Sequence, residues 1–157
     1  NLSAHGLDVK PPEKNRYAAG SGHRSFINFH QFNGQYLPEV NRSYDIVMFN
    51  SVLHHAAKKT RTLLREAARV SSRFIVVLED LAIDGHPQVT RRNYAHDPNG
   101  IFRSLPDWLE LFRTTPGIKD VRHDMLCQHL DDTTGPPCRS FGVSHRLFYV
   151  VFLALTE

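Results

Sequence analysis

The residues best placed for chemistry lie in the stretch from Tyr44 to His55, which ends in a pair of histidines. Its apolar run is typical of a buried strand, and the polar residues from Asn50 onward are typical of the loop that leaves such a strand. In an open α/β sheet, ligands bind at the carboxyl ends of the strands, so a site would fall in this loop. Histidine as a residue type has a pKa near neutral pH, so either His54 or His55 could act as a general base. The alternative is that both rings pack against the next helix or bond to backbone.

Two other predicted strands also end in carboxylates. The segment 2–9 is predicted to be a short strand that delivers Asp8 to its carboxyl end. The almost continuous apolar run 74–78 predicts a strand covered on both faces of a parallel sheet, followed by Glu79 and Asp80. Neighbouring carboxylates could form an acid–base pair or could simply end a strand in solvent, which is the favoured interpretation for Asp80.

Periodicity and turn signals define the other elements. The dipeptide Asn33-Gly34 is a strong turn signal, and Ser104, with Pro106 and Asp107 behind it, has the pattern of a helix start. The remaining predicted strands and helices are strands at 26–32, 118–126 and 147–155, a helix at 56–70, and a helix between Ser104 and Pro116.

Irregular segments separate these elements, and one of them could bind phosphate. The segment 10–24 contains Gly20-Ser21-Gly22, whose backbone could cradle a phosphate. That signal requires an apolar strand before it and a helix after it, and neither is present, so a plain loop is favoured. The long polar segment 81–101 is predicted to be a functional lid or disordered.

The two cysteines of the chain, Cys127 and Cys138, raise the question of a zinc site. Together with His129, and with His123 or His145, they could supply four ligands. Cys-x-His followed by a lone Cys is not a usual paired-ligand spacing. Small, partly buried side chains and no metal are therefore the favoured interpretation.

The predicted helix 56–70 carries a row of basic residues on a face apart from its apolar positions. They lie three and four residues apart: Lys58, Arg61, Arg65 and Arg69. A solvated face is the favoured interpretation. Contact with the phosphates of a nucleic acid, or with an acidic protein surface, is the alternative.

Composition limits the class of protein. The 157 residues, 41% of them hydrophobic, suffice for one domain with a core, and we expect a single domain over 1–157. No run of about 18 apolar residues exists, which excludes a membrane-spanning helix. The formal net charge of +3 permits an anionic partner without requiring one. We expect a soluble protein inside the cell, with the compartment left open.

The residues 44–55, Tyr-Asp-Ile-Val-Met-Phe-Asn-Ser-Val-Leu-His-His, resemble the central motif of class I S-adenosylmethionine-dependent methyltransferases. Later segments, at 63–70, 74–80, 105–112 and 147–155, are similar to the elements that follow this motif in the family. The resemblance implies an α/β, Rossmann-like, mostly parallel sheet with a C-terminal antiparallel strand pair. It also implies methyl transfer as the reaction and S-adenosylmethionine as the cofactor.

The same resemblance implies roles for residues at strand ends. Asp8 matches the acid that accepts hydrogen bonds from the ribose hydroxyls of the cofactor. Asn33 and Gly34 match the segment beside the adenine, where Asn33 replaces the usual Asp and keeps an acceptor for the adenine amine without the charge. Asn50 and the two histidines would border the methionine part of the cofactor and the acceptor substrate.

One part of the family's pattern has no counterpart in the sequence. The family's first strand, glycine-rich loop and first helix would precede residue 2, and that strand would lie between the predicted strands 2–9 and 44–50. A missing central strand leaves a gap lined with unpaired backbone groups. We therefore expect further polypeptide upstream, a partner chain that fills the gap, or a rearranged sheet.

Two functions from different classes follow. The leading hypothesis is a methyltransferase, active on an unidentified acceptor if the N-terminal part exists. The alternative is a catalytically inactive methyltransferase fold with a structural role in a larger assembly, such as a ribonucleoprotein. The missing glycine-rich loop, the basic helix face and the long polar insertions motivate this alternative.

Overall fold

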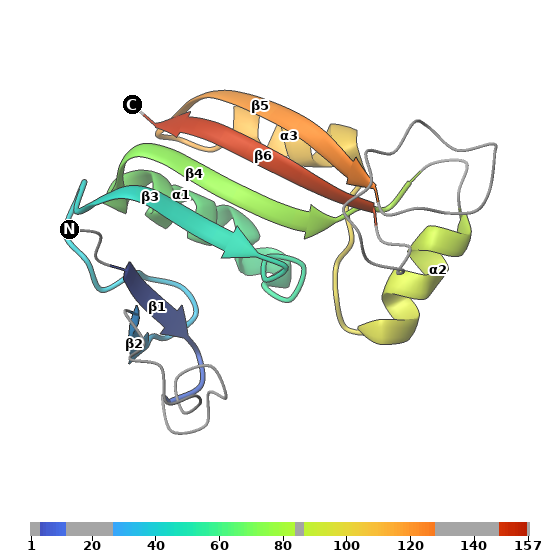
Figure 1. The fold of residues 1–157 in the computed structure, drawn as a ribbon, viewed down its shortest axis with the longest axis horizontal. Coiled ribbons are helices and arrows are strands. Elements are labelled where there is room, and N and C mark those ends of the chain that lie inside the picture. Colours follow the sequence, from blue (N-terminus) through green and yellow to red (C-terminus); the bar gives the residue numbers. More distant parts are fainter. Residues whose placement is uncertain (1–3, 12–26, 84–86, 128–147, 157) are drawn as a thin grey trace.

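The computed structural model describes residues 4–11, 27–83, 87–127 and 148–156, which form two sheets and three α-helices among them (Figure 1). The elements are β1 (Ala4–Asp8), β2 (Ile27–Gln31), β3 (Tyr44–Asn50), the 3-10 turn η2 (Ala57–Lys59), α1 (Thr60–Val70), β4 (Ser71–Asp80), α2 (Pro87–His96), α3 (Leu105–Arg113), β5 (Ile118–Cys127) and β6 (Phe148–Thr156). The glycine pair at 20–22 and three of the zinc candidates, His129, Cys138 and His145, lie outside the described residues.

The larger sheet has the strand order β3-β4-β6-β5. Strands β3 and β4 are parallel, and α1 makes the crossover that a parallel pair requires. Strand β6 lies antiparallel between β4 and β5. This arrangement confirms the predicted α/β fold with a C-terminal antiparallel strand pair.

The smaller sheet is the parallel pair β1-β2, in which Asp8 at the end of β1 is in register with Gln31 at the end of β2. Among the described residues, no ladder joins β1 to β3. Instead, a mainly apolar groove of about 340 Å³ lies between the two sheets. Its walls come from β1, β3, α1 and the segment after β2. The groove therefore lies where the family resemblance places a central strand.

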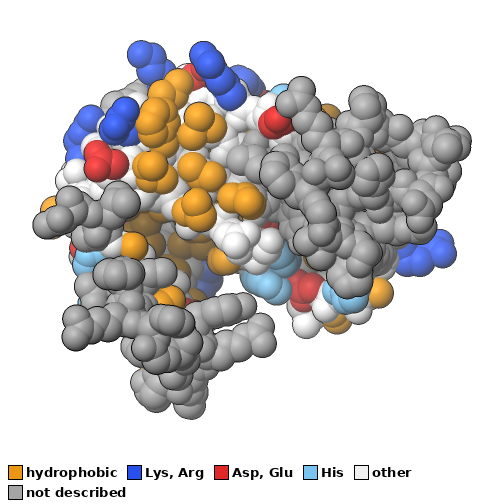
Figure 2. All heavy atoms as spheres, viewed as in Figure 1, with side chains coloured by type: hydrophobic (Ala, Val, Ile, Leu, Met, Phe, Trp, Pro, Cys, Tyr) orange, Lys and Arg blue, Asp and Glu red, His pale blue; other side chains and the backbone are white. Residues whose placement is uncertain are grey.

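The larger sheet is covered on one face, by α1 and α3 (Figure 1). Along β4, the fully buried residues Ile75 and Val77 alternate with half-buried neighbours. Cross-strand rows such as Met48–Val76–Leu153 make up the opposite face, where the side chain of Met48 is 62% exposed. Figure 2 shows hydrophobic side chains gathered over this sheet. The expectation that 74–78 is covered on both faces is therefore wrong for the described residues.

The helices follow local sequence signals to different degrees. Helix α3 begins as predicted: the Ser104 hydroxyl accepts from the Asp107 N–H, and the Asp107 carboxylate accepts from the Ser104 N–H. Helix α2, by contrast, lies in the segment 81–101, which was expected to be a functional lid or disordered. It has no strong apolar stripe, and tertiary contact holds it, since the buried Asn93 side chain donates to the Leu81 carbonyl at 3.1 Å.

Candidate functional site

The loop between β3 and α1 is held by Glu79, whose side chain is fully buried at the end of β4. One carboxylate oxygen accepts from the backbone N–H groups of Val52, at 2.8 Å, and Leu53, at 2.5 Å. The other oxygen lies 2.7 Å from His54 Nδ1. Glu79 is therefore not a solvated strand end, and the hydrogen-bond partners that it has among the described residues all lie in this loop. Glu79 sets the position of the loop.

The loop is also conformationally constrained at both ends. Ser51 and Ala57 have positive φ angles of 51° and 49°, which are uncommon for residues with a side chain. Such conformations persist when surrounding contacts over-determine them, and they gather at functional sites. Here the Ser51 N–H donates to the Leu78 carbonyl at 2.8 Å, and the N–H of the next residue along the chain donates to the Glu79 carboxylate.

His54 is buried and serves as a structural part of this loop. Its ring stacks on Phe102 with centroids 5.0 Å apart, and it lies 4.1 Å from the ring of His55. Burial alone lowers the pKa of His54, but the hydrogen bond and charge of Glu79, with the charges of Asp80 and Asp97, outweigh it and raise the pKa above 6.5. The contacts of His54 with Glu79 and Phe102 hold its ring in place within the loop.

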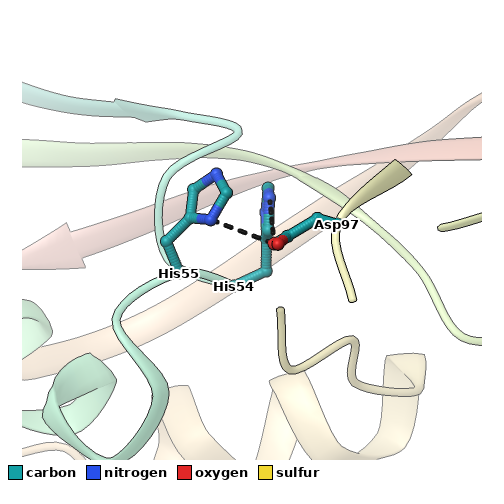
Figure 3. A group of neighbouring side chains, drawn as sticks. All are labelled: His54, His55 and Asp97. Atoms are coloured by element: carbon teal, nitrogen blue, oxygen red, sulfur yellow. Dashed lines mark ion pairs between the residues drawn. The ribbon is translucent and has the colours of Figure 1, made fainter. Parts of the chain in front are cut away.

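His55 faces solvent, and Asp97 lies beside it. The His55 side chain is 59% exposed, and its Nδ1 lies 3.0 Å from Asp97 Oδ2 (Figure 3). The same oxygen lies 3.7 Å from His54 Nε2. Asp97 follows α2, and the Ile101 N–H ties its turn to the loop by donating to the His54 carbonyl at 2.8 Å. Asp97 was not predicted as a site residue. In the sequence it belongs to Asp97-Pro98-Asn99-Gly100, which signals a turn and gives no indication of a site.

A second group of predicted residues lies at the ends of β1 and β2. The Phe32 N–H donates to the Asp8 carbonyl at 3.0 Å, which brings Asp8 close to Asn33 and Gly34. Asn33 Oδ1 accepts from the N–H groups of Gln35, at 2.9 Å, and Tyr36, at 2.8 Å. Both lone pairs of this oxygen are thus engaged in the local turn, in which Gly34 has a φ of +75°.

The structure therefore collects the predicted residues in two places. Asp8, Asn33 and Gly34 belong to the smaller sheet, and β1 forms one wall of the groove. Asn50, exposed at the end of β3, leads into the loop of His54 and His55 on the larger sheet, and β3 forms the opposite wall. Both groups lie at the carboxyl ends of parallel strands, as expected for a ligand site.

Other candidate sites have less support from the geometry. Within the basic row, the Arg69 guanidinium bonds Glu66 at 2.7 Å, and Arg61 bonds the Thr114 hydroxyl at 2.7 Å, whereas Lys58 and Arg65 are exposed. Of the zinc candidates, His123 lies exposed on β5, and the side chain of Cys127 lies outside the described ones. No α-helix of the described chain has the length and apolar character needed to cross a membrane.

Comparison with known proteins gives a family-model match over part of the chain and solved structures with a similar fold. The family model described as a methyltransferase domain matches residues 2–73. No curated protein matches the chain. Among solved structures, the YcgJ protein of Bacillus subtilis is similar, with a TM-score of 0.68 and 16% identity over 99% of this chain and 82% of that one.

Two further structures share the fold. One is a chain from the Haloferax volcanii complex between the Trm112 methyltransferase activator and a methyltransferase, with a TM-score of 0.67 and 16% identity over 98% of this chain and 72% of that one. The other is the magnesium protoporphyrin IX methyltransferase of Synechocystis, solved with bound SAH, with a TM-score of 0.62 and 15% identity over 99% and 64%. The resemblance to class I S-adenosylmethionine-dependent methyltransferases is thus confirmed: the chain has their fold, and residues 2–73 match their methyltransferase domain.

Proposed function

We propose that the protein transfers a methyl group from S-adenosylmethionine to an acceptor substrate. The observation that carries this proposal is the arrangement of the two groups of strand-end residues. Asp8 and the Asn33-Gly34 turn lie beside one wall of the groove, and the loop that begins at Asn50 follows the strand on the other. In a chain with this fold, that is where a cofactor and an acceptor would meet.

The residues on the β1-β2 side fit the adenosine part of the cofactor. The Asp8 Oδ1 accepts a hydrogen bond from the Lys10 N–H at 2.9 Å, and a carboxylate, with its two acceptor oxygens, suits the vicinal diol of a ribose. Asn33 and Gly34 would border the adenine. Because the turn engages the Asn33 oxygen, its amide NH₂ is the group left to meet the base.

The loop on the other side would border the acceptor. S-adenosylmethionine supplies the electrophilic methyl group, and the protein has to hold the acceptor in line with it. We assign His54 a positioning role, since its Nδ1–H is committed to Glu79. Asn50 and His55 are exposed and are the side chains that can touch the acceptor.

We further infer that an extended polypeptide strand occupies the groove and completes the sheet. Strand β3 has a partner only on its β4 side, and β1 only on its β2 side, among the described residues. Unpaired strand edges readily accept another strand. The apolar face that carries Ile46 and Met48, 54% and 62% exposed, would be covered by structure that follows such a strand. The strand could belong to a longer form of this protein or to a partner chain.

Calorimetric titration of S-adenosylmethionine into the protein isolated from its natural source tests the proposed function. We expect saturable binding that Asp8→Ala weakens by at least about tenfold, because a good charged hydrogen bond contributes about 1.5–3 kcal/mol. Asp124→Ala, which removes an exposed carboxylate on β5, is the matched control and should leave binding unchanged. No heat of binding at about 1 mM cofactor would overturn the proposal and favour a structural, non-catalytic role.

A further inference from the structure

Three potential metal ligands meet above the β3–α1 loop, although they come from two separate parts of the chain. Each of His54, His55 and Asp97 offers one ligand atom, and these three atoms all lie within 4.8 Å of one another (Figure 3). Asp97 Oδ2 is inaccessible to solvent and accepts no hydrogen bond from the described residues, even though His55 Nδ1 is only 3.0 Å away. A buried carboxylate oxygen without a hydrogen bond is costly unless another group, such as a cation, satisfies it.

We propose that His54, His55 and Asp97 form a binding site for a divalent transition-metal ion of the Zn²⁺ type. Imidazole nitrogen and carboxylate oxygen are both ligands that Zn²⁺ accepts. Bonds of about 2.0–2.2 Å in a tetrahedral arrangement place neighbouring ligand atoms about 3.3–3.6 Å apart. The observed distances from Asp97 Oδ2, 3.0 Å to His55 Nδ1 and 3.7 Å to His54 Nε2, lie on either side of that range.

Glu79 prepares His54 for this role. Metal-bound histidines almost always donate their other ring N–H to a carboxylate or carbonyl, which fixes the tautomer and the ring orientation. Here the buried Glu79 carboxylate lies 2.7 Å from His54 Nδ1, so Nδ1 carries the proton and the lone pair of Nε2 is left for the metal. Phe102 stacks on the same ring and restricts its rotation.

The charge around the cluster also favours a cation. Glu79, Asp80 and Asp97 all act on His54 electrostatically. The guanidinium of Arg103 offsets part of this negative charge, and it is directed to the Ala57 carbonyl, at 3.2 Å, and to the Trp108 ring. Three carboxylates against one guanidinium leave a net negative environment, which stabilises a bound dication.

The proposed site keeps an open coordination position. Three protein ligands leave at least one position of a tetrahedral ion unfilled, which is typical of catalytic rather than structural zinc. The exposed side of His55 directs that position toward solvent, where water or a small oxygen or nitrogen ligand could enter. Metal binding by these three residues does not depend on methyl transfer, so either can fail without the other.

The test is a titration of the chelator-treated, metal-free protein with Co²⁺, followed by visible absorption, and with Zn²⁺, followed by calorimetry. We expect one ion per chain and the intense absorption of four-coordinate Co²⁺. His55→Ala should weaken Zn²⁺ binding by roughly 100-fold, and it should fold normally because this side chain is exposed. Asp97→Asn, which keeps the shape and removes the charge, should also weaken binding.

His123→Ala is the matched control, since it removes another exposed histidine. It should leave the Co²⁺ spectrum and the Zn²⁺ affinity unchanged. Loss of binding in His123→Ala with retention in His55→Ala would place the ion at β5 and overturn the proposal. Absence of binding at about 1 mM Zn²⁺ would also overturn it, and would identify the cluster as imidazole–carboxylate pairs without metal.

Discussion

The two sheets of this molecule differ in how they are stabilised. The larger sheet and its helices share a core of fully buried residues, with Trp108, Phe112 and Phe152 in mutual ring contact. In β1 and β2, none of the described side chains is buried. Because burial of apolar surface is the main driving force of folding, the larger unit supplies its own stability, whereas the β1-β2 pair depends on what packs against it.

The two groups of residues in the proposed site lie on sheets of different stability. The loop of His54 and His55 belongs to the stable unit, and Asp8 with the Asn33-Gly34 turn belongs to the weakly packed pair. Cofactor binding would require both parts to hold their relative position across the groove. A strand that fills the groove would therefore stabilise the fold and the proposed cofactor site together.

The largest expected loss of stability comes from a substitution in the core of the larger sheet. Trp108 is fully buried, so Trp108→Ala should reduce the free energy of unfolding by about 3–5 kcal/mol. Phe29→Ala in β2 removes a half-buried ring and should cost about 1 kcal/mol. Urea unfolding followed by circular dichroism measures both. Equal losses would show that the two sheets fold as one unit and would contradict the comparison.

The next largest loss of stability is expected when Glu79, which holds the loop between β3 and α1, is replaced. Glu79→Gln replaces a buried, charged acceptor of the Val52 and Leu53 N–H groups and should cost about 2–3 kcal/mol. Glu110→Gln, in an exposed pair with Arg113, is the control and should cost less than about 0.5 kcal/mol. Thermal unfolding at a fixed pH separates them. A Glu79→Gln variant as stable as the control would show that the loop holds its position without this carboxylate.

A smaller effect concerns the dependence of stability on pH. The hydrogen bond from Arg69 holds the pKa of Glu66 below 4.5, although burial opposes this shift. A lowered folded-state pKa means that the pair's contribution is complete above pH 4.5 and is lost as the pH falls through the folded-state value. The contribution is about 1 kcal/mol. Glu66→Gln should therefore flatten the acid side of the stability profile below pH 4.5; an unchanged profile would refute this assignment.

A substitution in β1 should have the smallest effect on overall stability, and it should distinguish the stability of the two sheets most clearly. A Cβ at Gly6 would overlap the ring of Phe29, so Gly6→Ala should disrupt the pairing of β1 with β2. Amide hydrogen exchange should quicken in both of these strands and stay unchanged in β4 and β6. Faster exchange throughout β4 would mean that the small sheet supports the large one.

Much of the fold could be predicted because local signals and tertiary packing agree. Each strand predicted from an apolar run is present, and α3 begins at the capping box that Ser104 and Asp107 form. The predicted gap beside the strand 44–50 corresponds to the groove along β3. The open face of the sheet could not be predicted, because a continuous apolar run does not reveal which of its faces is covered.

The structural features that could not be predicted from the sequence depend on contacts between residues that are far apart in the chain. Helix α2 has little apolar periodicity, and Asn93 ties it to Leu81. Asp97 reaches the histidines only because that helix and the following turn bring it there. Glu79 could be recognised as a carboxylate at a strand end, but its three partners in the loop are a property of the folded chain.

The most direct test of the central claim is ultraviolet crosslinking of methyl-labelled S-adenosylmethionine to the natural protein, with peptide mapping of the label. If both walls of the groove build the cofactor site, label should appear in peptides that contain Asp8 or Asn33 and in the peptide that contains Asn50. Excess S-adenosylhomocysteine should suppress both signals. Label that is absent, or that resists this competition, would contradict the proposal that the strand ends on both sides of the groove build the cofactor site.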